Sequence, residues 1–142
     1  MEATLDKLDE LSFVALNLWP EHSLNDIRNV LEKYIKGDNT SAFMCLVDDK
    51  CVGLALVSLR HDYVEGCITS PIGYLEAICV NKEYRKNGIA SKLYEECEDW
   101  ARNKGCIEFA SDCELDNEAS YNFHLSIGFV EANRIIHFVK KI

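Results

Sequence analysis

The apolar positions near the start of the chain recur at the three- and four-residue spacing of amphipathic helices. The first stretch predicts a helix from about residue 6 to residue 18, ended by Trp19-Pro20, with an apolar face of Leu8, Leu11, Val14, Ala15 and Leu18. Ser23 is a suitable N-cap for a second helix that ends at Gly37. Its apolar face consists of Leu24, Ile27, Leu31, Tyr34 and Ile35.

The middle of the chain changes to short apolar runs that are typical of β-strands. Residues 41–47 and 51–59 form two such runs, and the polar turn Asp48-Asp49-Lys50 between them predicts a hairpin. Residues 61–71 are loop-like and precede a further predicted strand at 74–80.

Helices and strands alternate in the second half of the chain. The pattern predicts a helix over 88–104, closed by Gly105, and a strand over 106–113. A short helix is predicted over 117–127, ended by Gly128, and residues 129–142 would supply a last strand or a hairpin.

The order of these elements indicates the fold class. The two strands joined through the 88–104 helix should be parallel, whereas the hairpin is antiparallel. We therefore expect a single α/β domain over residues 1–142, with a mixed, mostly antiparallel sheet, a central parallel strand pair and about four flanking helices. A Rossmann fold is the main alternative, but Gly-x-Gly-x-x-Gly is absent and the strands before residue 70 lack crossover helices.

Composition and charge narrow the range of partners. The chain has 142 residues, of which 48% are apolar, and this suits one domain with its own core. No apolar run is long enough to span a bilayer. The N-terminus lacks the pattern of a secretory signal. Seven cysteines without Cys-x-x-Cys spacing indicate reduced thiols in a cytoplasmic protein, without a disulfide framework or metal site. The net charge of −9 disfavours nucleic acid and anionic membranes and suits a cationic ligand, although solubility alone would also explain it.

One segment between a predicted strand and a predicted helix is suited to bind an anion. This anion cradle, residues 84–91, reads Tyr84-Arg85-Lys86-Asn87-Gly88-Ile89-Ala90-Ser91. Gly88 and Ala90 let the backbone approach a ligand closely, and the N–H groups of the first helical turn have no partners within the helix. Because the helix dipole adds positive charge there, a pyrophosphate is the expected ligand.

Two motifs in this order resemble the GNAT superfamily of N-acetyltransferases over nearly the whole chain. The family pattern Arg/Gln-x-x-Gly-x-Gly/Ala is matched by Arg85, Gly88 and Ala90. The family also has an Asn, an aromatic hydroxyl seven residues later and then Gly-Phe, which here reads Asn117, His124 and Gly128-Phe129. The spacing is kept, but the hydroxyl is replaced by an imidazole.

A more specific resemblance is to the bacterial aminoglycoside 6′-N-acetyltransferases. The shared segments are Leu18-Trp19-Pro20 with His22, Arg60-His61-Asp62-Tyr63-Val64 with Gly66-Cys67, Leu75-Glu76, Asn103-Lys104-Gly105-Cys106 and Ala110-Ser111-Asp112. The Arg-His-Asp-Tyr-Val block contributes most to this resemblance, because such a loop sequence has no obvious structural purpose.

The resemblance implies acetyl-CoA as the donor, no metal, and an aminoglycoside amine as the acceptor. It implies that the acceptor pocket is lined by Trp19, Tyr63, Glu76 and Asp112. It implies donor contacts from Ile78, Cys79, Val80 and Asn117, beside Arg85, Lys86, Asn87, Gly88, Ile89, Ala90 and Ser91. A further drug contact is expected near the last strand pair, where the family can have an acidic residue and this chain has Asn133, with Glu131 two residues earlier.

The chemistry requires that a substrate ammonium lose its proton before it attacks a thioester. Glu76, beside the expected donor site, is the candidate to bind the amine and to deprotonate it directly or through water. A salt-bridge or capping role is the alternative for Glu76.

Asp112, at the end of a strand, is either an acceptor-binding residue or a turn-forming Asp. Backbone N–H groups of Cys79 or Val80 would polarise the carbonyl, and the Cys79 thiol is interpreted as buried packing.

The remaining candidates keep structural alternatives. His124 is either a structural residue of its helix or the acid that protonates the CoA thiolate, with Tyr121 as the other donor. Trp19 and Tyr63 are either packing and anchoring residues or pocket walls for sugar rings and amines. Arg60 and His61 are interpreted as loop-positioning residues.

The favoured function is therefore aminoglycoside 6′-N-acetylation by direct transfer, which confers antibiotic resistance. The alternatives are acetylation of a polyamine or peptide amine and, in another class, a non-catalytic acetyl-CoA-binding regulatory module. The apolar C-terminal pattern, which includes Ile135-Ile136 and Phe138-Val139, predicts together with the resemblance a homodimer.

Overall fold

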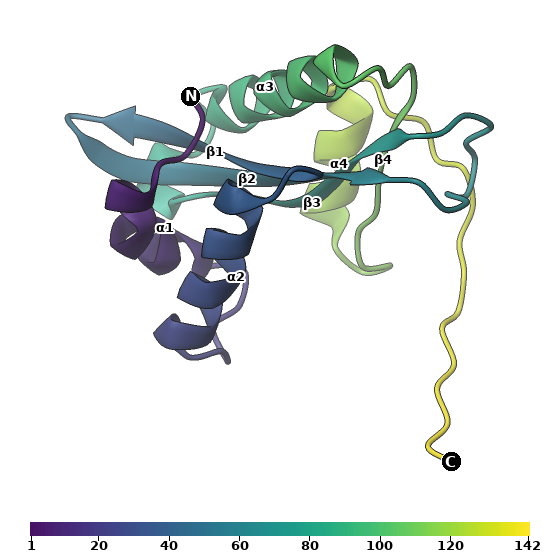
Figure 1. The fold of residues 1–142 in the computed structure, drawn as a ribbon, viewed down its shortest axis with the longest axis horizontal. Helices are drawn as coiled ribbons and strands as arrows, with labels where there is room; N and C mark the ends of the chain where they lie inside the picture. The colour runs from purple at the N-terminus through teal and green to yellow at the C-terminus, as the bar shows by residue number, and fades with distance from the viewer.

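The computed structural model describes all 142 residues (Figure 1). The N-terminal elements are a 3-10 turn η1 (Leu5–Lys7) and the helices α1 (Leu8–Ala15) and α2 (Leu24–Lys36). They are followed by the strands β1 (Thr40–Val47), β2 (Lys50–Arg60) and β3 (Ile72–Val80). The last elements are a 3-10 turn η2 (Lys82–Tyr84), α3 (Ile89–Asn103), β4 (Phe109–Ser111) and α4 (Glu118–Ser126). None of the helices is long and apolar enough to cross a membrane.

The four strands form one mixed sheet in the order β1-β2-β3-β4. The predicted hairpin is confirmed, because β1 and β2 are antiparallel and joined by Asp48 and Asp49, whose φ angles of 49° and 62° suit a tight hairpin turn. β2 and β3 are also antiparallel. β3 and β4, which are connected through α3, are parallel as predicted.

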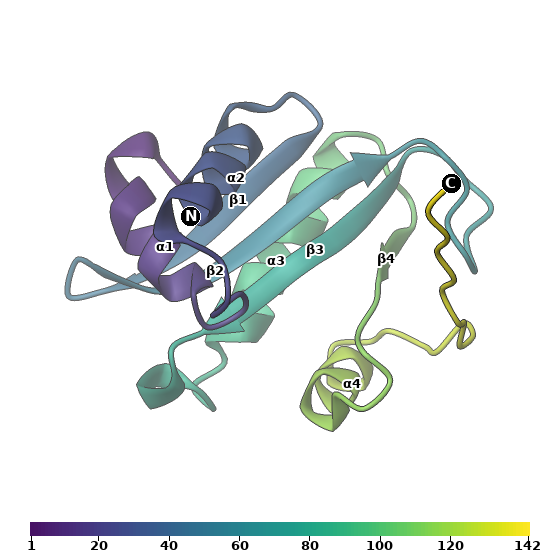
Figure 2. The ribbon, with the colours of Figure 1, turned by 90° about the horizontal axis from the view of Figure 1, so that it is seen from below.

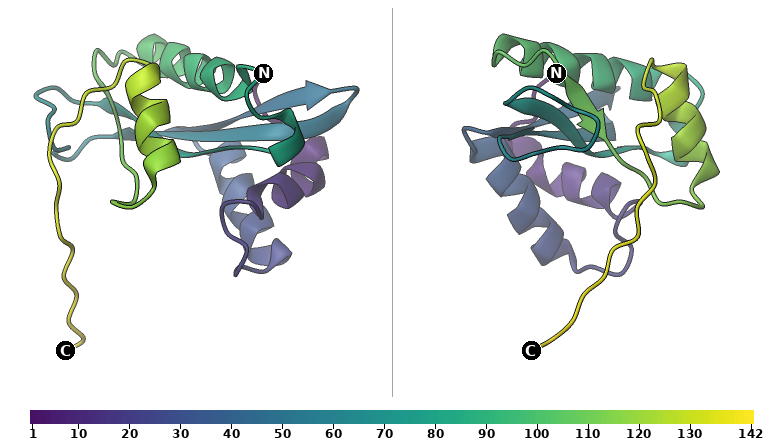
Figure 3. Two further views of the ribbon diagram at one scale, coloured as in Figure 1. Left: turned by 180° about the vertical axis from the view of Figure 1, so that it is seen from behind. Right: turned by 90° about the vertical axis from the view of Figure 1, so that its right-hand side faces the viewer.

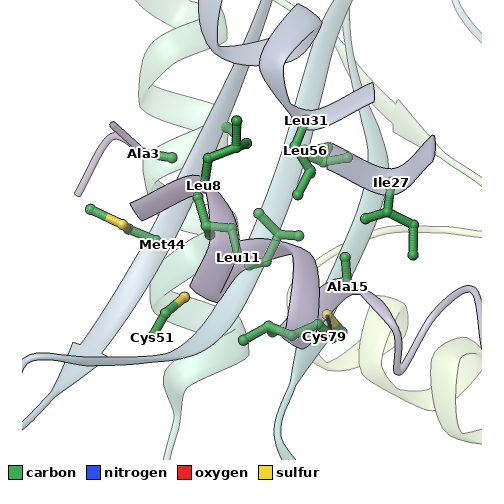
Figure 4. Close-up of a cluster of buried hydrophobic side chains, with 13 residues drawn as sticks. Ala3, Leu8, Leu11, Ala15, Ile27, Leu31, Met44, Cys51, Leu56 and Cys79 are labelled. Atoms are coloured by element: carbon green, nitrogen blue, oxygen red, sulfur yellow. Dashed lines mark hydrogen bonds between the residues drawn. The ribbon is translucent and has the colours of Figure 1, made fainter. Parts of the chain in front are cut away.

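Helices cover both faces of the sheet. Figures 1 and 3 show α1 and α2 on one face and α3 on the other. A cluster of 13 buried residues joins α1 and α2 to the sheet, and its members include Leu11, Leu31 and Leu56 (Figure 4). A second cluster of 8 buried residues lies on the side of α3 and includes Leu93 and Cys97. Most of the apolar face of α1, α2 and α3 is buried in these two clusters, whereas α4 has no buried residue.

The predicted helix boundaries are close to those observed. The Ser23 hydroxyl accepts a hydrogen bond from the Asp26 N–H (3.1 Å), which confirms the predicted N-cap of α2. The first helix ends at Ala15, earlier than expected, although the Leu18 N–H still donates to the Ala15 carbonyl (2.9 Å).

The strand predicted over 106–113 is wrong in its extent. Only Phe109, Ala110 and Ser111 pair with β3, so the observed strand has 3 residues. Its pairing ends where β3 becomes irregular, after Leu75.

The last strand or hairpin predicted over 129–142 is absent. Residues 130–142, the C-terminal arm, form no backbone–backbone hydrogen bond. The end of the arm extends away from the body of the protein in Figure 1 and points toward the viewer in Figure 2. A strand needs a neighbouring strand for its N–H and C=O groups, and none lies beside the arm. As a consequence, the parallel pair lies at one edge of the sheet and not, as expected, in its centre.

Candidate active site

A β-bulge in β3 sets the direction of Glu76. Leu56 and Val57 on β2 pair with the residues on either side of Glu76, so Glu76 has no partner there. The pairing with β4 ends at the same level, where Leu75 faces Ser111. Bulges redirect side chains and are frequent next to active sites. Beyond this level β3 continues without a strand along its second edge.

Backbone groups of β3 point into this open edge. The Asn81 N–H donates to the Val52 carbonyl of β2 (2.8 Å). Because backbone groups alternate in direction along a strand, the N–H groups of Val80 and Ile78 point away from β2, whereas that of Cys79 points toward it. Of the two N–H groups predicted to polarise a thioester, only that of Val80 therefore points into the open edge.

The anion cradle follows directly. Gly88, the N-cap of α3, has a φ angle of +74°, which favours glycine. No hydrogen bond is donated by the backbone N–H groups at the start of α3, which are those of Ile89, Ala90 and Ser91. They point toward the side from which an anion would approach a helix N-terminus.

The loop before α3 is held by its own side chains. The Arg85 Nε donates to the Val80 carbonyl (2.9 Å), and the Asn87 amide donates to the Tyr84 carbonyl (3.1 Å). Lys86 adopts a positive φ of 64°, which is uncommon for a residue other than glycine. Arg85 thus connects the cradle to the end of β3.

Glu76 is paired with a cation of its own chain. The Arg60 guanidinium donates to both carboxylate oxygens, from Nε to Oε1 (3.0 Å) and from Nη2 to Oε2 (2.9 Å). The Ser58 hydroxyl also donates to Oε1 (2.6 Å). The Glu76 side chain is 23% exposed, so the carboxylate can be reached by a ligand. Oε2 accepts a hydrogen bond from only one donor and can therefore accept one more hydrogen bond from a ligand.

Asp112 is connected to the same group of side chains. The guanidinium carbon of Arg60 lies 3.3 Å from the centre of the Tyr74 ring, and the Tyr74 hydroxyl donates to the Asp112 carboxylate. Burial, followed by this hydrogen bond, raises the pKa of the Tyr74 hydroxyl, so Tyr74 stays a donor. We call Ser58, Arg60, Tyr74, Glu76 and Asp112 the carboxylate network.

His124 contacts β4 and its own helix. Its Nδ1 donates to the Ser120 carbonyl (2.6 Å), because a carbonyl only accepts. Nε2 is then the acceptor for the Ser111 hydroxyl (2.7 Å). In this tautomer the imidazole has no free N–H, so an acidic role would require a second ring proton. Tyr121, the other candidate, donates from its hydroxyl to Glu131 (3.2 Å).

Two further candidates have structural roles in the observed contacts. The Cys79 thiol is buried and donates to the Val14 carbonyl (3.6 Å), and burial raises its pKa to about 12. A thiol of this kind packs and is a poor nucleophile. The Asn117 side-chain oxygen accepts from the Ser120 N–H (3.1 Å) as the N-cap of α4. No group of three or more His, Cys, Asp or Glu side chains is arranged to hold a metal ion.

Three candidates make no hydrogen bond to the carboxylate network. Trp19 is partly buried against the cluster under α1 and α2. Tyr63 is 77% exposed in the loop after β2 and donates to Glu65 (3.3 Å). Asn133 is exposed on the C-terminal arm.

Sequence reasoning missed the roles of Ser58, Tyr74 and Ser111, and it interpreted Arg60 only as a loop-positioning residue. A usable signal was present, because Ser58 and Arg60 are two residues apart on one strand and Tyr74 and Glu76 two residues apart on the next. Alternation puts each pair on one face, and Ser58 faces Tyr74 across the strands.

The open edge of β3, the anion cradle that follows this strand and the carboxylate network at its bulge are the parts that an acetyltransferase needs. The model of the acetyltransferase (GNAT) family matches residues 4–129, and the chain belongs to this family, as predicted.

Similar proteins cover nearly the whole chain. The aminoglycoside N(6′)-acetyltransferase type 1 of Salmonella typhimurium is 36% identical over 134 residues, which cover 94% of this chain and 92% of that protein. The protein of the same name from Serratia marcescens is 35% identical over 138 residues, with coverage of 96% and 94%.

Solved structures agree with the fold. AAC(6′)-Iy in complex with the bisubstrate analogue CoA-S-monomethyl-acetylneamine has a TM-score of 0.95 at 33% identity and covers 100% of this chain and 97% of its own. The aminoglycoside 6′-N-acetyltransferase AAC(6′)-Ih from Acinetobacter baumannii has a TM-score of 0.92 at 34% identity, with the same coverage. The predicted mixed α/β fold of a GNAT protein is thus confirmed.

Proposed function

We propose that the protein is an acetyl-CoA-dependent aminoglycoside 6′-N-acetyltransferase that confers resistance to these antibiotics. The observation that carries the proposal is the carboxylate network, with Glu76 and Asp112, at the point where β3 and β4 separate. The relatives support the choice of substrate, because proteins of this name match nearly the full chain.

The donor is acetyl-CoA. Its pyrophosphate binds the free N–H groups of the anion cradle, and the rest of the cofactor follows the open edge of β3 past Val80 and Ile78. The complex of AAC(6′)-Iy with a CoA-containing analogue supports this donor. In this position the Val80 N–H donates to the thioester carbonyl and stabilises the charge that develops on its oxygen. Asn117, the N-cap of α4, is the further donor contact in this proposal.

The acceptor is an amine that is a cation in water. Glu76 and Asp112 supply acceptors for charge-assisted hydrogen bonds to ammonium groups, and the net charge of −9 attracts a polycation to the protein. Trp19 and Tyr63 are the side chains that would pack on the sugar rings. Asn133 is retained as a drug contact only in a dimer, since it lies on the extended arm.

Direct transfer needs few groups. The ammonium first loses a proton, directly or through water, at Glu76. The neutral nitrogen then forms a bond to the thioester carbon and the C–S bond breaks. The nitrogen loses its second proton to solvent, again through Glu76, and the CoA thiolate takes up a proton. The products are the 6′-N-acetyl drug and free CoA. His124 in its doubly protonated form, or the Tyr121 hydroxyl, is the candidate donor of that last proton.

The protein acts as a homodimer. The C-terminal arm carries strongly exposed apolar side chains, among them Phe138 (91%) and Val139 (97%), and its backbone is unpaired. The outer edge of β4 is open, whereas the outer edge of β1 is partly covered by the first residues of the chain. An open strand edge and an unpaired apolar arm favour pairing with a second copy.

The proposed compartment is the cytoplasm. All seven cysteines are free, and burial raises the pKa of several of their thiols. Unpaired thiols in this number suit a reducing environment, where acetyl-CoA is also available.

The test is release of free CoA with a panel of acceptors. We expect turnover with aminoglycosides that carry a 6′-amine, and none with a matched drug that has a 6′-hydroxyl. Faster turnover with polyamines or peptide amines would replace the proposed substrate by that class. Acetyl-CoA binding without turnover of any amine would indicate a regulatory module.

A further inference from the structure

Arg60 holds Glu76 in a way that a loop-positioning residue does not require. Its guanidinium makes two hydrogen bonds to the carboxylate and stacks on the Tyr74 ring, so it is fixed from two sides. This contact places a full positive charge directly against the carboxylate. The charge of Glu76 is therefore already balanced before any ligand arrives.

We propose that Arg60 is a positioning residue that keeps the acceptor amine in its uncharged, reactive form by balancing the charge of Glu76. This proposal rests on the proposed function, because it needs an amine at Glu76. An unbalanced carboxylate would hold the amine as an ammonium ion, since a nearby opposite charge favours the charged form. The Arg60 cation cancels that preference.

The carboxylate still accepts the amine in this arrangement. Oε1 receives two protein donors, whereas Oε2 receives only Arg60 Nη2 and can accept one more N–H. The N–H bond that breaks gives its proton to this oxygen, which passes it on to solvent water, so that Glu76 returns to the carboxylate form. The nitrogen keeps the electron pair that attacks the thioester.

The other charged and titratable groups around Glu76 do not compensate for a loss of Arg60. They include Tyr34 on α2, Tyr74 on β3 and, through Tyr74, Asp112 after β4. Burial and, second, the charge of Glu76 raise the pKa of the Tyr34 hydroxyl, so Tyr34 stays uncharged. Asp112 is an anion and would further favour the ammonium form. Arg60 is thus the cation of this cluster.

The experiment compares kcat for a 6′-amine aminoglycoside from about pH 5.5 to pH 9.5. The enzymes are the wild type, Arg60→Gln, Arg60→Lys and Arg102→Gln. Arg102 pairs with Glu98 and Asp99 on the exposed face of α3, so its replacement makes the same charge change elsewhere. Thermal melting checks that each variant is folded.

On the acidic side of the pH profile kcat rises with pH, and we expect this rise to occur about one pH unit higher in Arg60→Gln. A shift of one pH unit corresponds to a tenfold lower kcat at pH values below the rise. At alkaline pH the two enzymes should converge. Arg60→Lys should recover most of the loss, and Arg102→Gln should follow the wild type.

A constant ratio of Arg60→Gln to wild type at every pH would overturn the proposal, because it would indicate support of geometry alone. So would a lysine variant as impaired as the glutamine variant. If the wild type acetylated no aminoglycoside, the proposed function would fail separately, and the same variants would be compared on the polyamine or peptide amine that is acetylated.

Discussion

Replacement of Gly88 by glutamate tests the anion cradle. The φ angle of Gly88 is +74°, and a Cβ at this position would meet no atom within 4 Å. The substitution therefore causes backbone strain without a clash, which lowers the free energy of unfolding by about 1–2 kcal/mol. The new carboxylate would lie beside the free N–H groups of Ile89, Ala90 and Ser91.

The expected loss of CoA affinity follows from charge. Two unit charges at a separation of ~4 Å repel by about 1 kcal/mol in water and by about 4 kcal/mol near a protein surface. The glutamate also competes for the N–H groups that would bind the pyrophosphate. A loss of ~1.4 kcal/mol is a tenfold change in Kd, so we expect the Kd for CoA to rise at least tenfold.

Titration calorimetry with CoA measures this change, and Gly105→Glu is the matched control. Gly105 lies just beyond the other end of α3, has a φ of +91°, and a Cβ there would also meet no atom within 4 Å. Both variants should melt at a similarly lowered temperature, but only Gly88→Glu should lose CoA affinity. An unchanged Kd in folded Gly88→Glu would refute the cradle.

Three further predictions concern the acceptor site, the dimer and the core. Glu76→Gln should lower kcat by about 10²-fold, whereas Asp112→Asn should mainly raise KM for the drug; identical steady-state profiles would contradict this division of roles. Phe138→Glu should give monomers in sedimentation at micromolar concentration, whereas Phe13→Glu on α1, where Phe13 is 62% exposed, should not. A wild-type monomer with full activity would exclude the dimer as a requirement. Burial raises the pKa of the Cys79 thiol from 9.0 to about 12, so the unfolded chain loses this proton first and stability should fall as the pH rises from about 9 to 12. Denaturant unfolding should find a smaller fall in Cys79→Ala, and equal slopes would refute the assignment.

Local patterns were sufficient for most of the elements. The spacing of Leu8, Leu11 and Val14 identified α1, and Ser23 marked the start of α2, because helix periodicity and capping depend on neighbouring residues. The turn at Asp48-Asp49 likewise identified the β1–β2 hairpin. Such signals are contained within one segment of the chain.

The errors arose where structure depends on a partner distant in sequence. The arm has the apolar residues of a strand, such as Phe138 and Val139, but no strand lies beside it within the chain. The bulge at Glu76 follows from the register between β2 and β3, which composition does not encode locally. The resemblance selected Glu76 and Asp112, whereas their connection through Arg60 and Tyr74 emerged only from the folded arrangement.

The position of the acetyl group on the product tests the central claim most directly. NMR of the product formed from acetyl-CoA and a kanamycin-type drug should identify one new amide at the 6′-nitrogen. An amide at any other amine of the drug, or no acetylated drug at all, would contradict the proposed function.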